Sequence, residues 1–195
     1  CFSKVFEKLV YNRLMKYLTK SSVLYDHQYG FRSNLSTSMA ILEMVEKITD
    51  AIDNNKFSIG IFIDLSKAFD TVNHKVLVNK LHFYGIRGTA LNWFKSYLSN
   101  RQQYVLYNGT ASTRLPVTCG VPQGSILGPI LFLLYVNDIA TVSPVLHLIL
   151  FADDTNIFMS HHDLPTLVRM LNVELKLLSS WFRANKLSLN VDKTH

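Results

Sequence analysis

Apolar positions along the chain recur at spacings that predict a succession of helices. Residues 5–18 and 37–52 place apolar side chains three and four positions apart, which is typical of amphipathic helices. The same spacing predicts further helices at 74–84, 90–98, 129–139 and 164–182. Pro129 suits the start of a helix because a first helical position needs no backbone N–H.

Runs of β-branched and alternating apolar residues predict the strands. Residues 57–64 are interpreted as a buried strand with Asp64 at its carboxyl end. Residues 103–107 and 113–118 predict two short strands around Asn108-Gly109, a dipeptide that favours tight hairpins.

Three further strands are predicted in the last third of the chain. Residues 146–152 and 155–159 form an expected hairpin around two adjacent acids, and 187–191 form an expected final strand. Strands and helices in this irregular order favour an α+β fold, in which a mixed sheet carries helices on one face.

Composition narrows the class of protein. A chain of 195 residues that is 48% hydrophobic can bury a core, so disorder is not expected. The net charge of +6 favours a polyanionic partner. Cys1 and Cys119 lack the spacing of a disulfide framework or zinc site, so we expect a reducing, intracellular setting.

Two features of the chain concern its surroundings and its extent. The longest apolar run, residues 126–136, is too short to span a bilayer, and no signal peptide is visible, so no membrane partner is expected. The chain begins without Met in the middle of an amphipathic pattern, which indicates an excised fragment of a longer protein.

The candidate catalytic residues are Asp64, Asp153 and Asp154. An isolated Asp-Asp pair is more often a solvated turn, but here a third acid ends another apolar strand. If the two elements are neighbours, all three carboxylates meet at one sheet edge, where their repulsion favours a divalent cation. Oxygen ligands favour Mg²⁺ or Mn²⁺ over Zn²⁺.

The roles of the two adjacent acids should differ. Neighbouring side chains on a strand point to opposite faces, so we expect Asp153 beside Asp64 as principal ligand, with Asp154 in support. Such a site can transfer phosphoryl groups by a two-metal route that polymerases and nucleases share, and the acids alone leave both open.

Five blocks in order resemble the motifs of reverse transcriptases. Residues 62–70, 120–129 and 151–154 are similar to the three central motifs, 28–32 to a fingers motif and 181–194 to the motif downstream. The Phe-Ala-Asp-Asp block and the Lys-Ala-Phe-Asp block are similar to those of non-long-terminal-repeat retrotransposons, particularly jockey-like elements. Group II intron enzymes are the nearest family with which they could be confused.

This resemblance implies a right-hand polymerase without its thumb. Residues 1–56 would be part of the fingers, and 57–195 the palm with a fingers/palm insertion around 74–118, both within one reverse transcriptase domain. The palm would hold a mixed antiparallel sheet backed by helices.

The resemblance also implies roles for individual residues. Asp64, Asp153 and Asp154 would be catalytic and, with Leu65, would hold two Mg²⁺ or Mn²⁺ ions. The remaining implied site residues are Arg32 on the incoming triphosphate, Phe69 as a gate against the ribose 2′-hydroxyl, Gln123 and Gly124 beside the nucleotide, and Lys193 as a possible general acid. The first three have plainer alternatives: a surface arginine, a core aromatic or a tight turn. Lys193 lies two residues from the end of the chain.

The implied activity is RNA-directed DNA synthesis in target-primed reverse transcription. Its partners would be an RNA template, a DNA primer or target, dNTPs, and the endonuclease and thumb regions of a parent polyprotein. The expected location is the nucleus and cytoplasm, as a ribonucleoprotein. Two alternatives stay open: a non-catalytic RNA-binding remnant of a retroelement, and an RNA-templated RNA polymerase.

Overall fold

The structure, a computed structural model, describes residues 2–195, so Cys1 lies outside the described residues. Its helices are α1 Phe2–Lys20, α2 Thr37–Asp53, α3 Ala68–Thr71, α4 His74–Phe83, α5 Gly88–Leu98, α6 Gly128–Val136 and α7 Leu164–Ala184, with 3-10 turns at Asn137–Thr141 and Val191–Lys193. The six predicted helices are confirmed, although the fifth ends early and continues as the first 3-10 turn. No described helix is long and apolar enough to cross a membrane.

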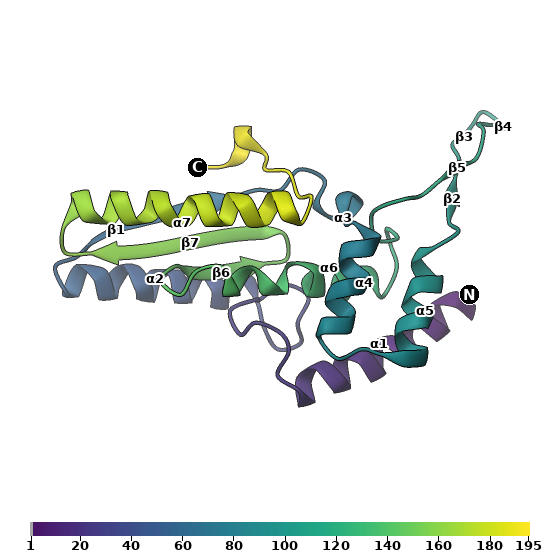
Figure 1. Cartoon of the computed structure of the whole chain (residues 1–195), viewed down its shortest axis with the longest axis horizontal. Helices are drawn as coiled ribbons and strands as arrows, with labels where there is room; N and C mark the ends of the chain where they lie inside the picture. Colours follow the sequence, from purple (N-terminus) through teal and green to yellow (C-terminus); the bar gives the residue numbers. More distant parts are fainter. Residues whose placement is uncertain (1) are drawn as a thin grey trace.

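The central sheet consists of β1 Phe57–Ile63, β7 Asp154–His161 and β6 His147–Phe151, in the order β1-β7-β6. Both pairings are antiparallel (Figure 1). A short strap, residues 27–29, adds to the free edge of β6: the Tyr29 N–H donates to the Leu150 carbonyl at 2.8 Å, and the Leu150 N–H to the His27 carbonyl at 2.9 Å. The described sheet is therefore antiparallel with one added parallel bridge, and the fold is of the predicted α+β class.

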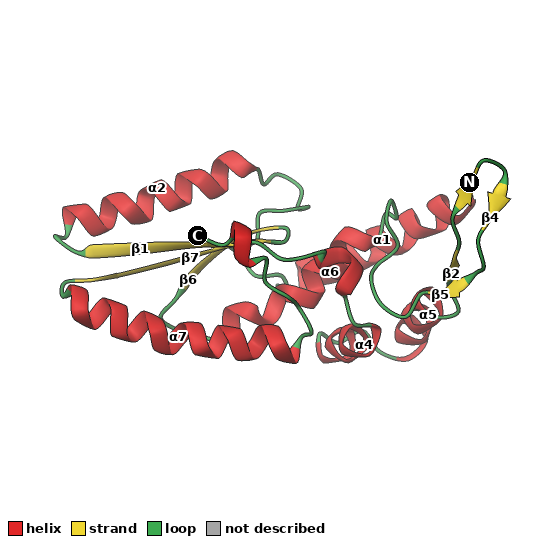
Figure 2. Ribbon diagram, turned by 90° about the horizontal axis from the view of Figure 1, so that it is seen from above, coloured by secondary structure: helices red, strands yellow, loops and turns green. Residues whose placement is uncertain are grey.

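Helices cover both faces of the sheet, so the expectation of helices on one face is wrong. Figure 2 shows α2 and α7 on opposite sides of the three strands. The strand β1 is also less buried than predicted, because Phe57 and Phe62 are each 51% exposed. It belongs to an antiparallel sheet, in which part of one face can remain exposed, so its apolar run does not require burial on both faces.

The helix α6 forms the centre of the core. Eight of its nine residues are buried, as its uniformly apolar sequence requires. It lies between the sheet and a second group made of α1, α4 and α5 (Figure 1). Within this group α1 reaches α5 through Phe6, whose ring centroid lies 5.7 Å from that of Trp93.

The predicted strands 103–107 and 113–118 are only partly correct. The structure has β2 Gln102–Gln103 paired with β5 Leu115–Pro116, and β3 Leu106–Tyr107 paired with β4 Thr110–Ala111. Both pairs form one arm that extends away from the body (Figure 1). A hairpin without further strands or a helix to pack on keeps only short ladders.

The predicted final strand, 187–191, is wrong. Leu189 forms one antiparallel bridge with Leu65, and the chain then turns through Val191–Lys193 before His195 pairs with Phe62. This segment follows the free edge of β1, but the 3-10 turn interrupts it and prevents a continuous ladder.

Candidate active site

The pairing of β1 with β7 brings the three predicted aspartates to one end of the sheet. Ile63 pairs with Thr155, so Asp64 leaves β1 beside the start of β7. Asp153 lies in the turn between β6 and β7, and Asp154 is the first residue of β7. The expectation that the two acidic elements are sheet neighbours is confirmed.

A cavity of about 550 Å³ opens at this edge, between the sheet and α2. Asp64, Asp154 and Lys193 line its polar end, while Phe62 and Ile41 line the apolar part. The structure therefore places the predicted general acid, Lys193, beside the predicted carboxylates.

The carboxylates repel one another. Partial burial, then the charges of Asp153 and Asp64, raise the pKa of Asp154, and only Lys193 opposes this rise. The ligand atoms of the three aspartates do not all come within 4.8 Å of one another in the part of the chain that is described. The three carboxylates offer the hard oxygen donors that a divalent cation such as Mg²⁺ or Mn²⁺ prefers.

Asn190 fixes Asp64. Its side-chain amide donates to Asp64 Oδ2 at 2.7 Å, and its backbone N–H donates to the Asp64 carbonyl at 2.9 Å. The sequence analysis gave Asn190 no role of its own, although it lies within the block 181–194 that carries the resemblance. Asn190 therefore holds both the main chain and the carboxylate of a predicted metal ligand.

Gln28 fixes the turn that carries Asp153. Its side chain is 2% exposed, and its Oε1 accepts the Gly30 N–H at 2.8 Å and the Ala152 N–H at 3.0 Å. Its Nε2 donates to the Ala152 carbonyl at 3.3 Å. Both polar groups of Ala152, the residue before Asp153, are thus held by one buried amide, a role the sequence analysis missed.

The backbone around this turn is packed closely. Ala152 has a positive φ of 58°, an unusual conformation for a residue with a side chain. A Cβ added to Gly30 would lie 2.2 Å from the Ala152 nitrogen, so only glycine fits there. We refer to Gln28 and Gly30 together as the turn clamp.

Phe69, Gln123 and Gly124 line a second cavity of about 380 Å³. The Phe69 ring stacks on Phe132 with centroids 4.4 Å apart, and the Gln123 amide donates to Asp70 Oδ1 at 2.8 Å. The structure brings these three predicted nucleotide-binding residues together, and their contacts with a nucleotide stay predictions.

Neither Arg32 nor Leu65 lines the two cavities described above. The Arg32 guanidinium donates to the carbonyls of Tyr25 at 2.8 Å and Gln28 at 3.2 Å, so here it stabilises the strap. The Leu65 side chain is buried, and its bridge to Leu189 uses the polar groups of the neighbouring residues rather than the Leu65 carbonyl. Their proposed contacts with phosphate and metal stay predictions.

Comparisons with known proteins agree with this geometry. The family described as "Reverse transcriptase (RNA-dependent DNA polymerase)" matches residues 1–195. The chain is 32% identical to the probable RNA-directed DNA polymerase from transposon BS of Drosophila melanogaster, over 98% of the chain and 22% of that protein. It is 28% identical to the RNA-directed DNA polymerase from mobile element jockey of the same species, over 97% of the chain and 21% of that protein. The chain thus spans about a fifth of the length of these relatives.

Solved structures share the fold. Apo telomerase from Candida tropicalis superposes with a TM-score of 0.70 at 14% identity, over 97% of this chain and 36% of that one. Telomerase from Candida albicans in complex with a fragment of telomeric RNA superposes with a TM-score of 0.67 at 13% identity, over 100% of this chain and 35% of that one. With its acids, motifs and relatives in agreement, the chain belongs to the reverse transcriptase family, and its resemblance to jockey-like retrotransposon enzymes is confirmed.

Proposed function

We propose that this chain is the fingers and palm region of a retrotransposon RNA-directed DNA polymerase, which adds deoxynucleotides to a DNA 3′-hydroxyl. The observation that carries the proposal is the convergence of Asp64, Asp153 and Asp154 at one end of the sheet, in a chain of the reverse transcriptase family. The position of Asp64 and Asp154 on one cavity with Lys193 supports it.

Asp64, Leu65, Asp153 and Asp154 would hold two Mg²⁺ or Mn²⁺ ions. Such ions stabilise the charge that develops on the attacking and leaving oxygens of phosphoryl transfer. Asn190 orients Asp64, and the turn clamp fixes the backbone next to Asp153. Lys193 lies on the same cavity and would donate a proton to the departing pyrophosphate.

The second cavity would receive the incoming nucleotide. Phe69 would exclude a ribose 2′-hydroxyl by its bulk, while Gln123, held by Asp70, and Gly124 would lie against the sugar and base. Arg32 would leave its carbonyl partners to pair with the triphosphate, a task that suits its always-charged bidentate fork.

The proposed partners are an RNA template, a DNA primer or nicked target, and dNTPs. Excess positive charge supports a nucleic-acid partner, since such duplexes are held mainly through their backbones. Residues 1–56 would belong to the fingers and 57–195 to the palm, with a thumb and an endonuclease elsewhere in the parent protein. Its ribonucleoprotein would work in the nucleus and cytoplasm.

Primer extension tests the proposal. A protein that carries this chain with its natural flanking sequence is incubated with a primed RNA template, dNTPs and Mg²⁺, beside its Asp153→Ala variant. Extension by the parent and none by the variant supports the assignment. Equal extension by both contradicts the metal assignment, while RNA binding without Mg²⁺-dependent extension supports a non-catalytic remnant.

A further inference from the structure

A second group of ligand-type side chains lies away from the three aspartates. Glu43 on α2 meets His27 of the strap and His147 of β6 through one carboxylate oxygen, Oε1. This oxygen lies 2.5 Å from His27 Nδ1 and 2.7 Å from His147 Nε2, and the three atoms all fall within 4.8 Å of one another. Three separate elements of the fold thus converge on one point.

The group is ordered by its surroundings. The side chain of Glu43 is 11% exposed, and its other oxygen accepts a hydrogen bond from the Tyr29 hydroxyl. The two imidazole rings lie 4.7 Å apart between centroids, so both rings gather at the same carboxylate. In proteins, carboxylates that bind a metal commonly accept a hydrogen bond of this kind on their second oxygen, which orients them.

The donor set differs from that of the active site. Two imidazole nitrogens and one carboxylate oxygen suit Zn²⁺ and similar transition metals, whereas Mg²⁺ prefers oxygen ligands alone.

We propose that His27, Glu43 and His147 form a binding site for a divalent transition metal of the Zn²⁺ class. With bonds of about 2 Å in a tetrahedral site, ligand atoms stand roughly 3.3 Å apart, so the two distances from Glu43 Oε1 to the imidazole nitrogens need to open by less than about 1 Å. The fourth position would be open to water.

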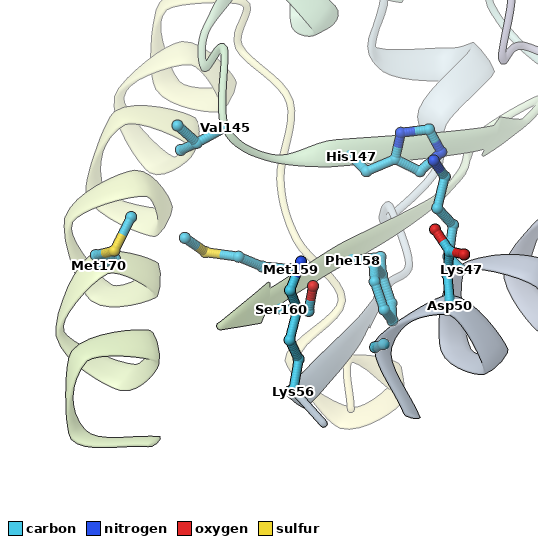
Figure 3. Close-up of a pocket in the computed structure, with 10 residues that line it drawn as sticks. Lys47, Asp50, Lys56, Val145, His147, Phe158, Met159, Ser160 and Met170 are labelled. Carbon is cyan, nitrogen blue, oxygen red and sulfur yellow. The ribbon is translucent and has the colours of Figure 1, made fainter. Parts of the chain in front are cut away.

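Two of the three proposed ligands, His27 and His147, are partly exposed to solvent. His147 lines a cavity of about 410 Å³ together with Lys47 and Asp50 of α2 and Ser160 of β7 (Figure 3). This cavity lies at the end of the sheet away from Asp153. The bound ion would tie α2 and β6 to the strap, and the ligand in the strap, His27, immediately precedes Gln28 of the turn clamp.

The sequence pattern could not indicate this site. Glu43 and His147 are 104 positions apart along the chain, far from the short spacings that identify zinc motifs. The inference does not depend on polymerase activity.

The test is a Zn²⁺ titration of the full chain by calorimetry, with bound metal counted by elemental analysis. Because Zn²⁺ can also bind carboxylates, all proteins carry Asp64→Asn and Asp153→Asn, which weaken the other acidic site. We expect one ion per chain and a thermal midpoint that rises with Zn²⁺, since a ligand that binds only the folded state stabilises it. A Co²⁺ complex should show the visible absorption of a tetrahedral nitrogen and oxygen site.

Three variants separate this site from adventitious binding. Glu43→Gln removes the central ligand and should weaken binding at least about a hundredfold, and Tyr29→Phe, which removes only outer-shell support, about tenfold. His82→Ala, an exposed histidine on α4, should bind as the parent does.

Each outcome decides the matter. Should Glu43→Gln fail to fold, as judged by circular dichroism, His27→Asn on the partly exposed strap replaces it, with the same loss expected. Absence of stoichiometric Zn²⁺ in the parent overturns the proposal, as does unchanged affinity in the ligand variant. In either case the three side chains form only a hydrogen-bonded group around Glu43. The proposed polymerase function does not depend on that result, because primer extension tests it separately.

Discussion

Replacing Gln28 with alanine should loosen the turn that presents Asp153. Gln28 lies 124 positions from Ala152 in sequence, yet its amide accepts the Ala152 N–H and donates to the Ala152 carbonyl. It also accepts the Gly30 N–H, so one side chain fixes the strap and the turn together. Without it, both backbone N–H groups lose their acceptor in a buried place.

The size of the loss follows from these contacts. A buried donor left unsatisfied costs about 1–3 kcal/mol, and Gln28→Ala creates two, for a sum of roughly 2–6 kcal/mol. Water that enters the space left by the side chain can satisfy part of this requirement, so we expect about 2–4 kcal/mol in the free energy of unfolding. A displacement of Asp153 by about 1 Å should also lower kcat by roughly a hundredfold.

Urea denaturation and primer extension measure the two effects. Gln28→Met keeps the length of the side chain without its hydrogen bonds, so it should lose nearly as much stability as Gln28→Ala. Gln103→Ala on the exposed arm is the control and should change stability by less than about 0.5 kcal/mol. A loss for Gln28→Ala no larger than that of the control would refute the reasoning, because it would show that the clamp contributes nothing.

Three further changes have defined outcomes. Asn190→Ala should raise the Mg²⁺ concentration needed for half-maximal primer extension about tenfold or more, since outer-shell partners tune metal affinity; an unchanged requirement contradicts the role given to Asn190. Phe69→Ala should raise ribonucleotide use relative to deoxynucleotide use about tenfold, and no gain would argue against the gate. Burial lowers the pKa of His147 from 6.5, whereas for Glu43 burial is outweighed by its hydrogen bonds and the pKa falls below 4.5. At these two groups the folded state binds fewer protons than the unfolded chain. In a protein that carries Asp154→Asn, which removes the carboxyl whose raised pKa acts in the opposite direction, the urea midpoint should fall as the pH drops from 7 toward 4; a flat midpoint contradicts this.

The sequence predicted that the candidate metal-binding acids would meet, because their position depends on local pattern. Asp64 and Asp153 follow apolar runs, and the ends of paired strands meet once the pairing is correct. The residues that hold these acids in position could not be predicted from local pattern. Gln28 and Asn190 act on residues 124 and 126 positions away, and a polar side chain does not indicate by itself which distant backbone it will meet.

The errors in the predicted fold have a common physical source. The runs at 57–64 and 187–191 have the composition of strands, but burial and ladder length depend on which neighbours the fold supplies. The strand β1 lies at a sheet edge, and the segment after Leu187 turns away from it through Val191–Lys193. The amphipathic pattern of α2 likewise showed that one face is apolar, without showing which face of the sheet it would cover.

The most direct test of the account is Mg²⁺-dependent extension of a primed RNA template by the parent protein and by Asp153→Asn, which keeps the shape of the side chain and removes its charge. Metal-ion catalysis contributes several kcal/mol to such a reaction, and a loss of about 4 kcal/mol corresponds to roughly a thousandfold in rate. The account predicts a loss of that order with RNA binding retained. Extension by Asp153→Asn at the rate of the parent would contradict it.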